Sequence, residues 1–190
     1  MFKHILVAID GSPFAETAQD YAMGLAKRFG AVLHGAHVID VTFIEGAFIT
    51  DVSGALGFEP FLNMQAQMRS TLEDVAEALR DRFGKRCEEA GLEHQFHLER
   101  AGVVHGLLGA ARMADLLVIG QRGVNARFHP DLLGAVAAVM LRRSPIPVLV
   151  VPADPPTLRT IMVGYDGSTK AVTALRCAAD GRVACGGRSA

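Results

Sequence analysis

The sequence has no tryptophan, only two tyrosines and only three cysteines. Cys87, Cys177 and Cys185 are too few and too scattered to indicate a disulfide framework or a cysteine zinc site. Acidic and basic residues almost balance, at a net charge of −1, so no excess of charge favours a nucleic-acid partner. No apolar run approaches the roughly 20 residues of a membrane span. The first residues do not have the pattern expected of a secretory leader, because Asp10 interrupts the apolar run too early. These absences predict a soluble, cytoplasmic protein with neither a nucleic-acid nor a membrane partner.

A segment near the N-terminus returns near the C-terminus. Residues 5–12 read ILVAIDGS, and residues 161–168 read IMVGYDGS. The spacing between the two is about one domain length. The repeat predicts a complete domain over residues 1–152, a stiff linker over 153–159, and the first strand and helix of a second repeat over 160–190, with a disordered tail.

Apolar runs and helical periods alternate through the first domain. We expect strands over 5–9, 31–39, 94–99, 116–119 and 147–151, and helices over 14–29, 64–90, 104–113 and 135–143. Alternation of this kind predicts an α/β fold with a five-stranded parallel sheet and helices on both faces. The Gly- and Phe-rich segment 41–62 is long for a connection, and is either a lid over a ligand cleft or a partner-binding patch.

Glycines surround the loop between the fourth strand and the next helix. Gly120-Gln121-Arg122-Gly123 is followed, ten residues later, by Gly134-Ala135 at a predicted helix start. Glycine permits positive φ and close backbone approach, and a helix start offers free N–H groups to an anion. No Walker lysine is present. The loop therefore predicts either a phosphate site, with charge from Arg122, Arg127 and His129, or a plain helix-capping turn.

Three further polar side chains are candidates for the same end of the sheet. Asp10 follows the first strand, where it either binds a ribose hydroxyl or metal ion or caps the next helix. His34 and His37 fall on the second strand, and we expect them to share one face. Two imidazoles without a third ligand make a poor metal site, so we expect both to pack or line the cleft, and no metal site is predicted.

Taken together, these motifs resemble the universal stress protein family. The resemblance rests on residues 5–12, the segment Ala36 to Asp40, the segment Ala114 to Gly120, the glycine loop, and Ser144 to Pro152. It covers residues 1–152 in order and resumes at residue 160, as in tandem-domain members with the second domain truncated. The resemblance implies an adenine-nucleotide alpha-hydrolase-like fold.

For members that bind ATP, with or without Mg²⁺, the resemblance implies a nucleotide site in this chain. Adenine would lie near Ala8, Ile9 and Val38, and ribose or a metal ion near Asp10. The phosphates would lie along the glycine loop and the helix that follows it. The residues implied for this part are Ile119, Gly120, Arg122, Gly123, Gly134, Ala135 and Val136.

The chain departs from the family's ATP-binding pattern at two points. The loop has one extra residue, and Ala135 stands where that pattern has Ser or Thr. A lost hydrogen bond to a charged group costs roughly 1.5–3 kcal/mol. Two functions therefore stay open: a stress-response regulatory protein that binds ATP, with at most slow hydrolysis and no catalytic residue, or a nucleotide-independent interaction protein with the site degraded at Ala135. The resemblance also implies a homodimer through the Pro147 to Val151 edge strand.

Overall fold

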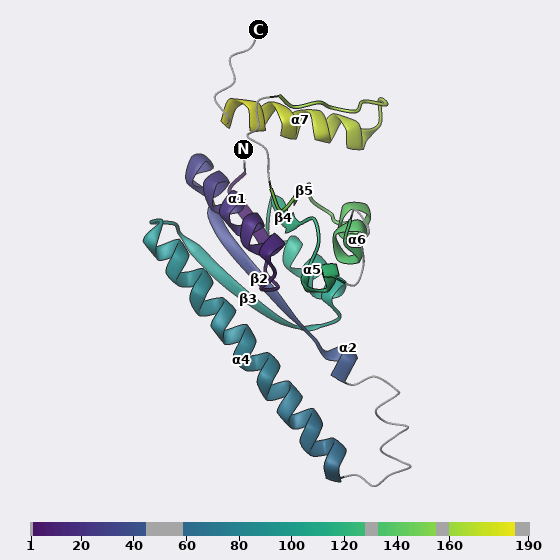
Figure 1. The fold of residues 1–190 in the computed structure, drawn as a ribbon. Coiled ribbons are helices and arrows are strands. Elements are labelled where there is room, and N and C mark those ends of the chain that lie inside the picture. Colours follow the sequence, from purple (N-terminus) through teal and green to yellow (C-terminus); the bar gives the residue numbers. More distant parts are fainter. Residues whose placement is uncertain (1, 45–58, 128–132, 155–159, 185–190) are drawn as a thin grey trace.

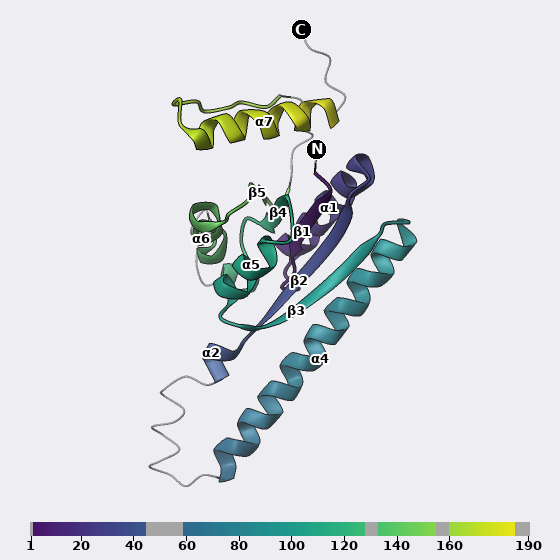
Figure 2. The ribbon, with the colours of Figure 1, turned by 180° about the vertical axis from the view of Figure 1, so that it is seen from behind.

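A parallel sheet of five strands forms the centre of the computed structural model, which describes residues 2–44, 59–127, 133–154 and 160–184. The strands lie in the order β3-β2-β1-β4-β5, and every pair is parallel. Figures 1 and 2 show the sheet, with all five strands labelled in Figure 2, and its topology confirms the predicted α/β fold. The strands are β1 His4–Ala8, β2 Val32–Asp40, β3 His94–Ala101, β4 Leu116–Gly120 and β5 Val148–Val151.

Helices cover both faces of the sheet (Figures 1 and 2). One face packs against α1, Pro13–Phe29, and α4, Glu59–Glu89, and the other packs against α5, Val103–Ala111, and α6, Ala135–Arg143. Residues 5–7 of β1 and 116–119 of β4 are apolar without interruption because both faces of these strands are covered. Ile5 and Val7 of β1 accordingly contribute to the first core, and Leu6 contributes to the second.

Local chemistry sets the ends of α1. The Ser12 side chain accepts a hydrogen bond from the Ala15 amide, Pro13 occupies the first turn, and Gly30 ends the helix in the left-handed conformation. These are the residues that cap a helix at each end. Among the described side chains, ion pairs join α1 to α4 from Arg82 to Glu16 and from Arg86 to Asp20.

The order of the strands reverses between β1 and β4. The chain first builds outward through β2 and β3, and then returns to the other side of β1 through β4 and β5. At such a reversal, the loops that follow the two neighbouring strands lead to opposite sides of the sheet. They leave a crevice at the carboxyl ends of the strands, where ligands of open α/β sheets bind. The loops after β1 and β4, which carry Asp10 and Gly123, meet at this point.

The C-terminal repeat forms its helix but not its strand. Helix α7 covers Thr169–Ala184, whereas residues 160–166 pair with no strand in the described part of the chain. Met162 is 95% exposed there. The expected strand fails because a β-strand is stable only beside a partner, and no second sheet is described next to it. The tail 185–190 lies outside the described residues.

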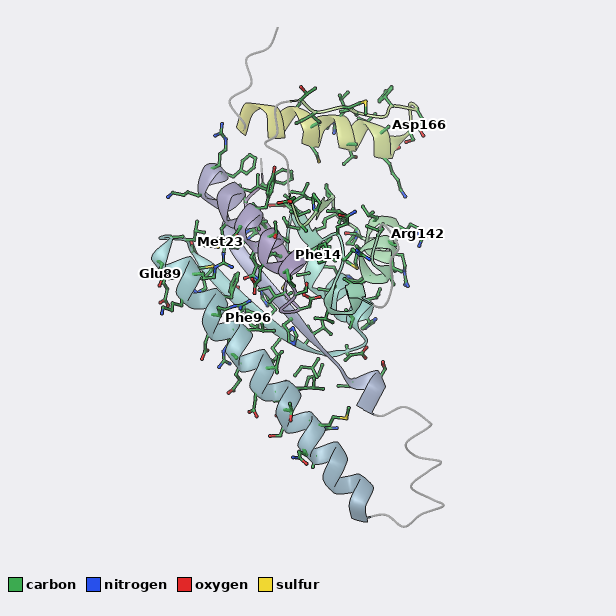
Figure 3. All side chains as sticks on the ribbon, in the orientation of Figure 1. Phe14, Met23, Glu89, Phe96, Arg142 and Asp166 are labelled. Atoms are coloured by element: carbon green, nitrogen blue, oxygen red, sulfur yellow. The ribbon has the colours of Figure 1, made fainter. Side chains whose placement is uncertain are left out.

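The turn that opens α7 still reproduces the turn that opens α1. The Ser168 amide donates to Asp166 Oδ1 at 2.9 Å, and the Ser168 hydroxyl accepts from the Ala171 amide at 3.1 Å. Gly167 has a φ of 81°, against 78° at Gly11. Figure 3 labels Asp166 at this turn. The repeat in sequence is thus a repeat in local structure, while its assignment as a second domain stays a prediction.

The long connection after β2 is partly helical. A short helix, α2, covers Val41–Ile44, and α4 begins at Glu59, earlier than the predicted residue 64. Residues 45–58, which carry most of the predicted lid or partner patch, lie outside the described residues.

Candidate functional site

Asp10 joins the two loops at the reversal of strand order. Its Oδ1 accepts a hydrogen bond from the Ser12 amide at 2.9 Å, and its Oδ2 accepts one from the Val124 amide at 3.2 Å. The first bond shapes the turn into α1, and the second reaches across to the loop after β4. Asp10 therefore stabilises the turn at the start of α1, which agrees with the predicted capping role. It also fixes the glycine loop beside that turn.

Gly120 and Gly123 are needed for close approach between the two loops. A Cβ on Gly120 would lie 2.8 Å from the Phe14 carbonyl carbon, and one on Gly123 would lie 2.7 Å from Asp10 Oδ2. Neither is among the glycines with positive φ. Of the two properties that glycine offers this loop, these positions use the close backbone approach that its lack of a side chain permits, and not a positive φ.

The N-terminus of α6 faces the same loop. The Gly134 amide donates to the Gln121 carbonyl at 2.9 Å, and no side chain caps the helix at Gly134. The first intrahelical bond runs from the Ala138 amide to the Gly134 carbonyl. The amides of the first turn, at Ala135 and Val136, thus have no partner within the helix, as at any helix start. They are the donors on which the prediction of a phosphate site at this loop depends.

Arg122 is held against its own loop and α1. Its Nη2 donates to the Ala126 carbonyl at 3.1 Å, and its guanidinium carbon lies 5.9 Å from the centre of the Phe14 ring. Figure 3 labels Phe14 on α1 and Arg142 on α6. One of the five N–H donors of the Arg122 guanidinium is therefore used within its own loop. The Arg127 side chain and His129, also candidates for charge at the phosphate site, lie outside the described residues.

The apolar residues of the predicted site divide between the two faces of the sheet. Ala8, Val38 and Ile119 belong to the core cluster under α5 and α6, on the face that also carries the start of α6. Ile9 is 4% exposed and packs into the opposite cluster. The first three therefore lie on the face of the sheet that packs against α5 and α6, whereas the Ile9 side chain packs on the opposite face.

A row of three histidines across β1, β2 and β3 was not foreseen. His34 Nε2 lies 3.1 Å from His4 Nδ1, and His34 Nδ1 lies 3.0 Å from His97 Nε2. The expectation that His34 and His37 share a face is wrong, because three positions separate them and side chains alternate along a strand. Within the described residues, no group of three or more His, Cys, Asp or Glu side chains could hold a metal ion.

Stability should fall below neutral pH because of His34. Burial lowers the pKa of His34 from its ordinary value of 6.5, His97 and His4 lower it further, and Glu93 opposes the shift. The folded protein therefore binds a proton at His34 more weakly than the unfolded chain does. Its contribution to stability is complete above pH 6.5 and is lost as the pH falls from 6.5 toward the pKa of the folded state. Chemical denaturation at pH 7.5 and 5.5 should show a smaller loss of stability in His34→Gln than in the wild type. Equal losses would contradict this assignment.

The fold and this arrangement define a class of protein: a doubly wound parallel α/β protein with a glycine-lined site at its strand-order reversal. The family profile described as "Universal stress protein family" matches residues 1–152. The chain belongs to the universal stress protein family.

Two relatives illustrate the range of similarity. A universal stress protein of Synechocystis, Slr1230, is 27% identical over 174 residues, which cover 87% of this chain and 61% of that protein. One from Staphylococcus aureus strain USA300 is 31% identical over 164 residues, which cover 80% of this chain and 89% of that protein. The chain thus spans 61% of the first relative and most of the second.

Solved structures confirm the fold. The universal stress protein UspA of Lactobacillus plantarum has a TM-score of 0.61 at 21% identity, over 78% of this chain and 96% of that one. A universal stress protein in complex with cAMP has a TM-score of 0.53 at 22% identity, over 80% of this chain and 98% of that one. An Arabidopsis thaliana member with AMP bound has a TM-score of 0.55 at 15% identity, over 79% and 91%. Among the described residues, none of the helices is both long and apolar enough to span a membrane.

Proposed function

We propose that this chain is a stress-response regulatory protein that binds ATP, with or without Mg²⁺, at the reversal between β1 and β4. The observation that carries the proposal is the meeting of Asp10, the glycine loop and the start of α6 at one point. Asp10 supplies an anionic oxygen of the kind that binds ribose hydroxyls or, through water, a cation. The free amides of α6 supply partial positive charge for phosphates.

Two structural neighbours support a nucleotide as the ligand class. One was solved with cAMP and one with AMP. The fold of this chain has the same architecture, and Ala8, Val38 and Ile119 cluster on the face that leads to the glycine loop. We propose ATP in preference to a monophosphate because backbone amides at two places, near Gly123 in the loop and near Gly134 at the start of α6, can each bind a phosphate. We assign no catalytic residue.

Calorimetry with ATP and Mg²⁺, with AMP as comparison, tests this proposal on the whole chain. Ala135 is exposed at the start of α6, and Ala135→Ser would add a hydroxyl donor there. A hydrogen bond to a charged phosphate should tighten ATP binding by about 10- to 150-fold. Ala135→Gly, which adds no donor, is the matched control. Absence of binding at millimolar ATP by both the wild type and Ala135→Ser would refute the site.

A second function is favoured by Ala135 and Arg122. Ala135 offers no hydroxyl to a phosphate, and Arg122 is already bonded to the Ala126 carbonyl at 3.1 Å. A nucleotide-independent dimer of the same fold would need neither residue. β5 offers the surface, because it pairs with β4 on one side and is an edge of the described sheet.

We propose that β5 of one copy pairs with β5 of another in a two-fold dimer. Apolar edge strands tend to be covered, and Val148, Leu149 and Val150 are each only half-buried here. Light scattering coupled to size exclusion should give twice the chain mass of 20.2 kDa at micromolar concentration. Val150→Pro, which perturbs the edge, should shift the mass toward a monomer. A wild type that is already monomeric would rule out this dimer.

A further inference from the structure

His37 bridges β1 and β2 at the place where these two strands separate. Their ladder ends at the pair Ala8 and Ala36, and the Ile9 amide then donates to the Ala36 carbonyl at 2.8 Å. β2 continues past this point on its other side, paired with β3 as far as Asp40 and Ala101. From residue 37 onward, the edge of β2 that faces β1 is therefore no longer paired with β1, and it lies beside the proposed nucleotide site.

The His37 imidazole bonds across the base of this opening. Its Nδ1 lies 2.7 Å from the carbonyl oxygen of Ile9. A carbonyl oxygen can only accept a hydrogen bond, so Nδ1 must carry the proton. The bond is short and half-buried, and it ties the first residue beyond the β1 ladder to β2.

The tethered carbonyl belongs to the residue directly before Asp10. A fixed Ile9 carbonyl fixes the direction in which the chain leaves β1. That direction places the Asp10 carboxylate where it accepts from the amides of Ser12, at 2.9 Å, and Val124, at 3.2 Å. The path from β2 to the glycine loop therefore runs through His37, Ile9 and Asp10.

We infer that His37 is a positioning residue that holds the Asp10 turn in its nucleotide-binding conformation. The inference rests on the proposed function, since it assigns His37 a role at that same site. Only the Nδ1 donor is required for this role. An asparagine amide reaches about the same position and can replace it, whereas leucine keeps bulk and loses the donor.

The test compares His37→Leu, His37→Asn and the wild type in the full chain. Calorimetry measures ATP and AMP affinity, and NMR measures hydrogen exchange of the Ser12 and Val124 amides, which report the Asp10 bonds directly. Loss of one hydrogen bond should weaken binding about 3- to 10-fold in His37→Leu and speed exchange at both amides. His37→Asn should restore both properties. His105→Leu, at an exposed histidine of α5, is the control and should change neither.

The two readouts separate the possible failures. If the wild type binds neither nucleotide, the proposed function fails, and amide exchange alone then decides the role of His37. Unchanged exchange at Ser12 and Val124 in His37→Leu would overturn the inference. So would a His37→Asn variant as impaired as His37→Leu, because that result would mean that the imidazole acts by its shape and not by its donor.

Discussion

Replacing Phe83 with alanine is expected to lower the free energy of unfolding by about 3–5 kcal/mol. Phe83 is 1% exposed and lies between α4 and the sheet. Its ring lies 5.7 Å from the ring of Phe96 and 5.9 Å from that of His94, by centroids. β2 makes room for it at Gly35, where a Cβ would approach the Phe83 ring to 2.9 Å. Truncation would leave a cavity at a site shaped from three elements.

Urea denaturation followed by circular dichroism measures this effect. Val75→Ala is the control, because Val75 lies on the same helix and is 47% exposed. Its effect should stay within about 0.5 kcal/mol. A loss below 1 kcal/mol for Phe83→Ala would mean that α4 relaxes onto the sheet, and that the packing between Phe83 and Gly35 does not determine the position of this helix.

Gly123→Val is expected to weaken ATP binding by about 10- to 150-fold while the protein stays folded. A Cβ at this position would lie 2.7 Å from Asp10 Oδ2, so the carboxylate must turn away and lose the Val124 amide at 3.2 Å. A carboxylate turned away from the site would also lose its proposed bond to the ribose, and one hydrogen bond to a charged group corresponds to this change in affinity. The clash falls on the end of a side chain, which can move, and for this reason the fold should survive.

Calorimetry and thermal unfolding together measure this outcome. Gly24→Ala is the matched control, since nothing lies within 4 Å of a Cβ there. That change should leave ATP binding intact and raise stability by about 0.5–1 kcal/mol, because alanine favours helix over glycine. Unaltered ATP affinity in Gly123→Val would remove Asp10 and the glycine loop from the site. An unfolded Gly123→Val would show that the loop is needed for the fold itself.

The predicted elements agree with the structure wherever short-range chemistry determines them. α1 begins after Ser12 and ends at Gly30 because a hydroxyl cap and a left-handed glycine act within one turn. α6 covers residues 135–143 as predicted. The alternation of apolar strands with helices also sufficed to predict a parallel sheet, since parallel neighbours need a crossover between them.

Other features depended on which strands become neighbours. The row His4, His34 and His97 joins three strands whose register no local pattern reveals. The turn at residues 166–168 formed from its own hydrogen bonds, whereas residues 160–166 needed a second strand and remained unpaired in the described chain.

The sequence by itself determined most of the elements, the caps of α1, the parallel sheet and the family of this protein. Each follows from residues close together in the chain or from a motif read in order. Only the tertiary structure decided that Gly120 and Gly123 serve close approach, that Ile9 turns its side chain away from the site, and that His37 holds the Ile9 carbonyl. These contacts join distant segments, and their geometry exists only once the strands have set their order and register.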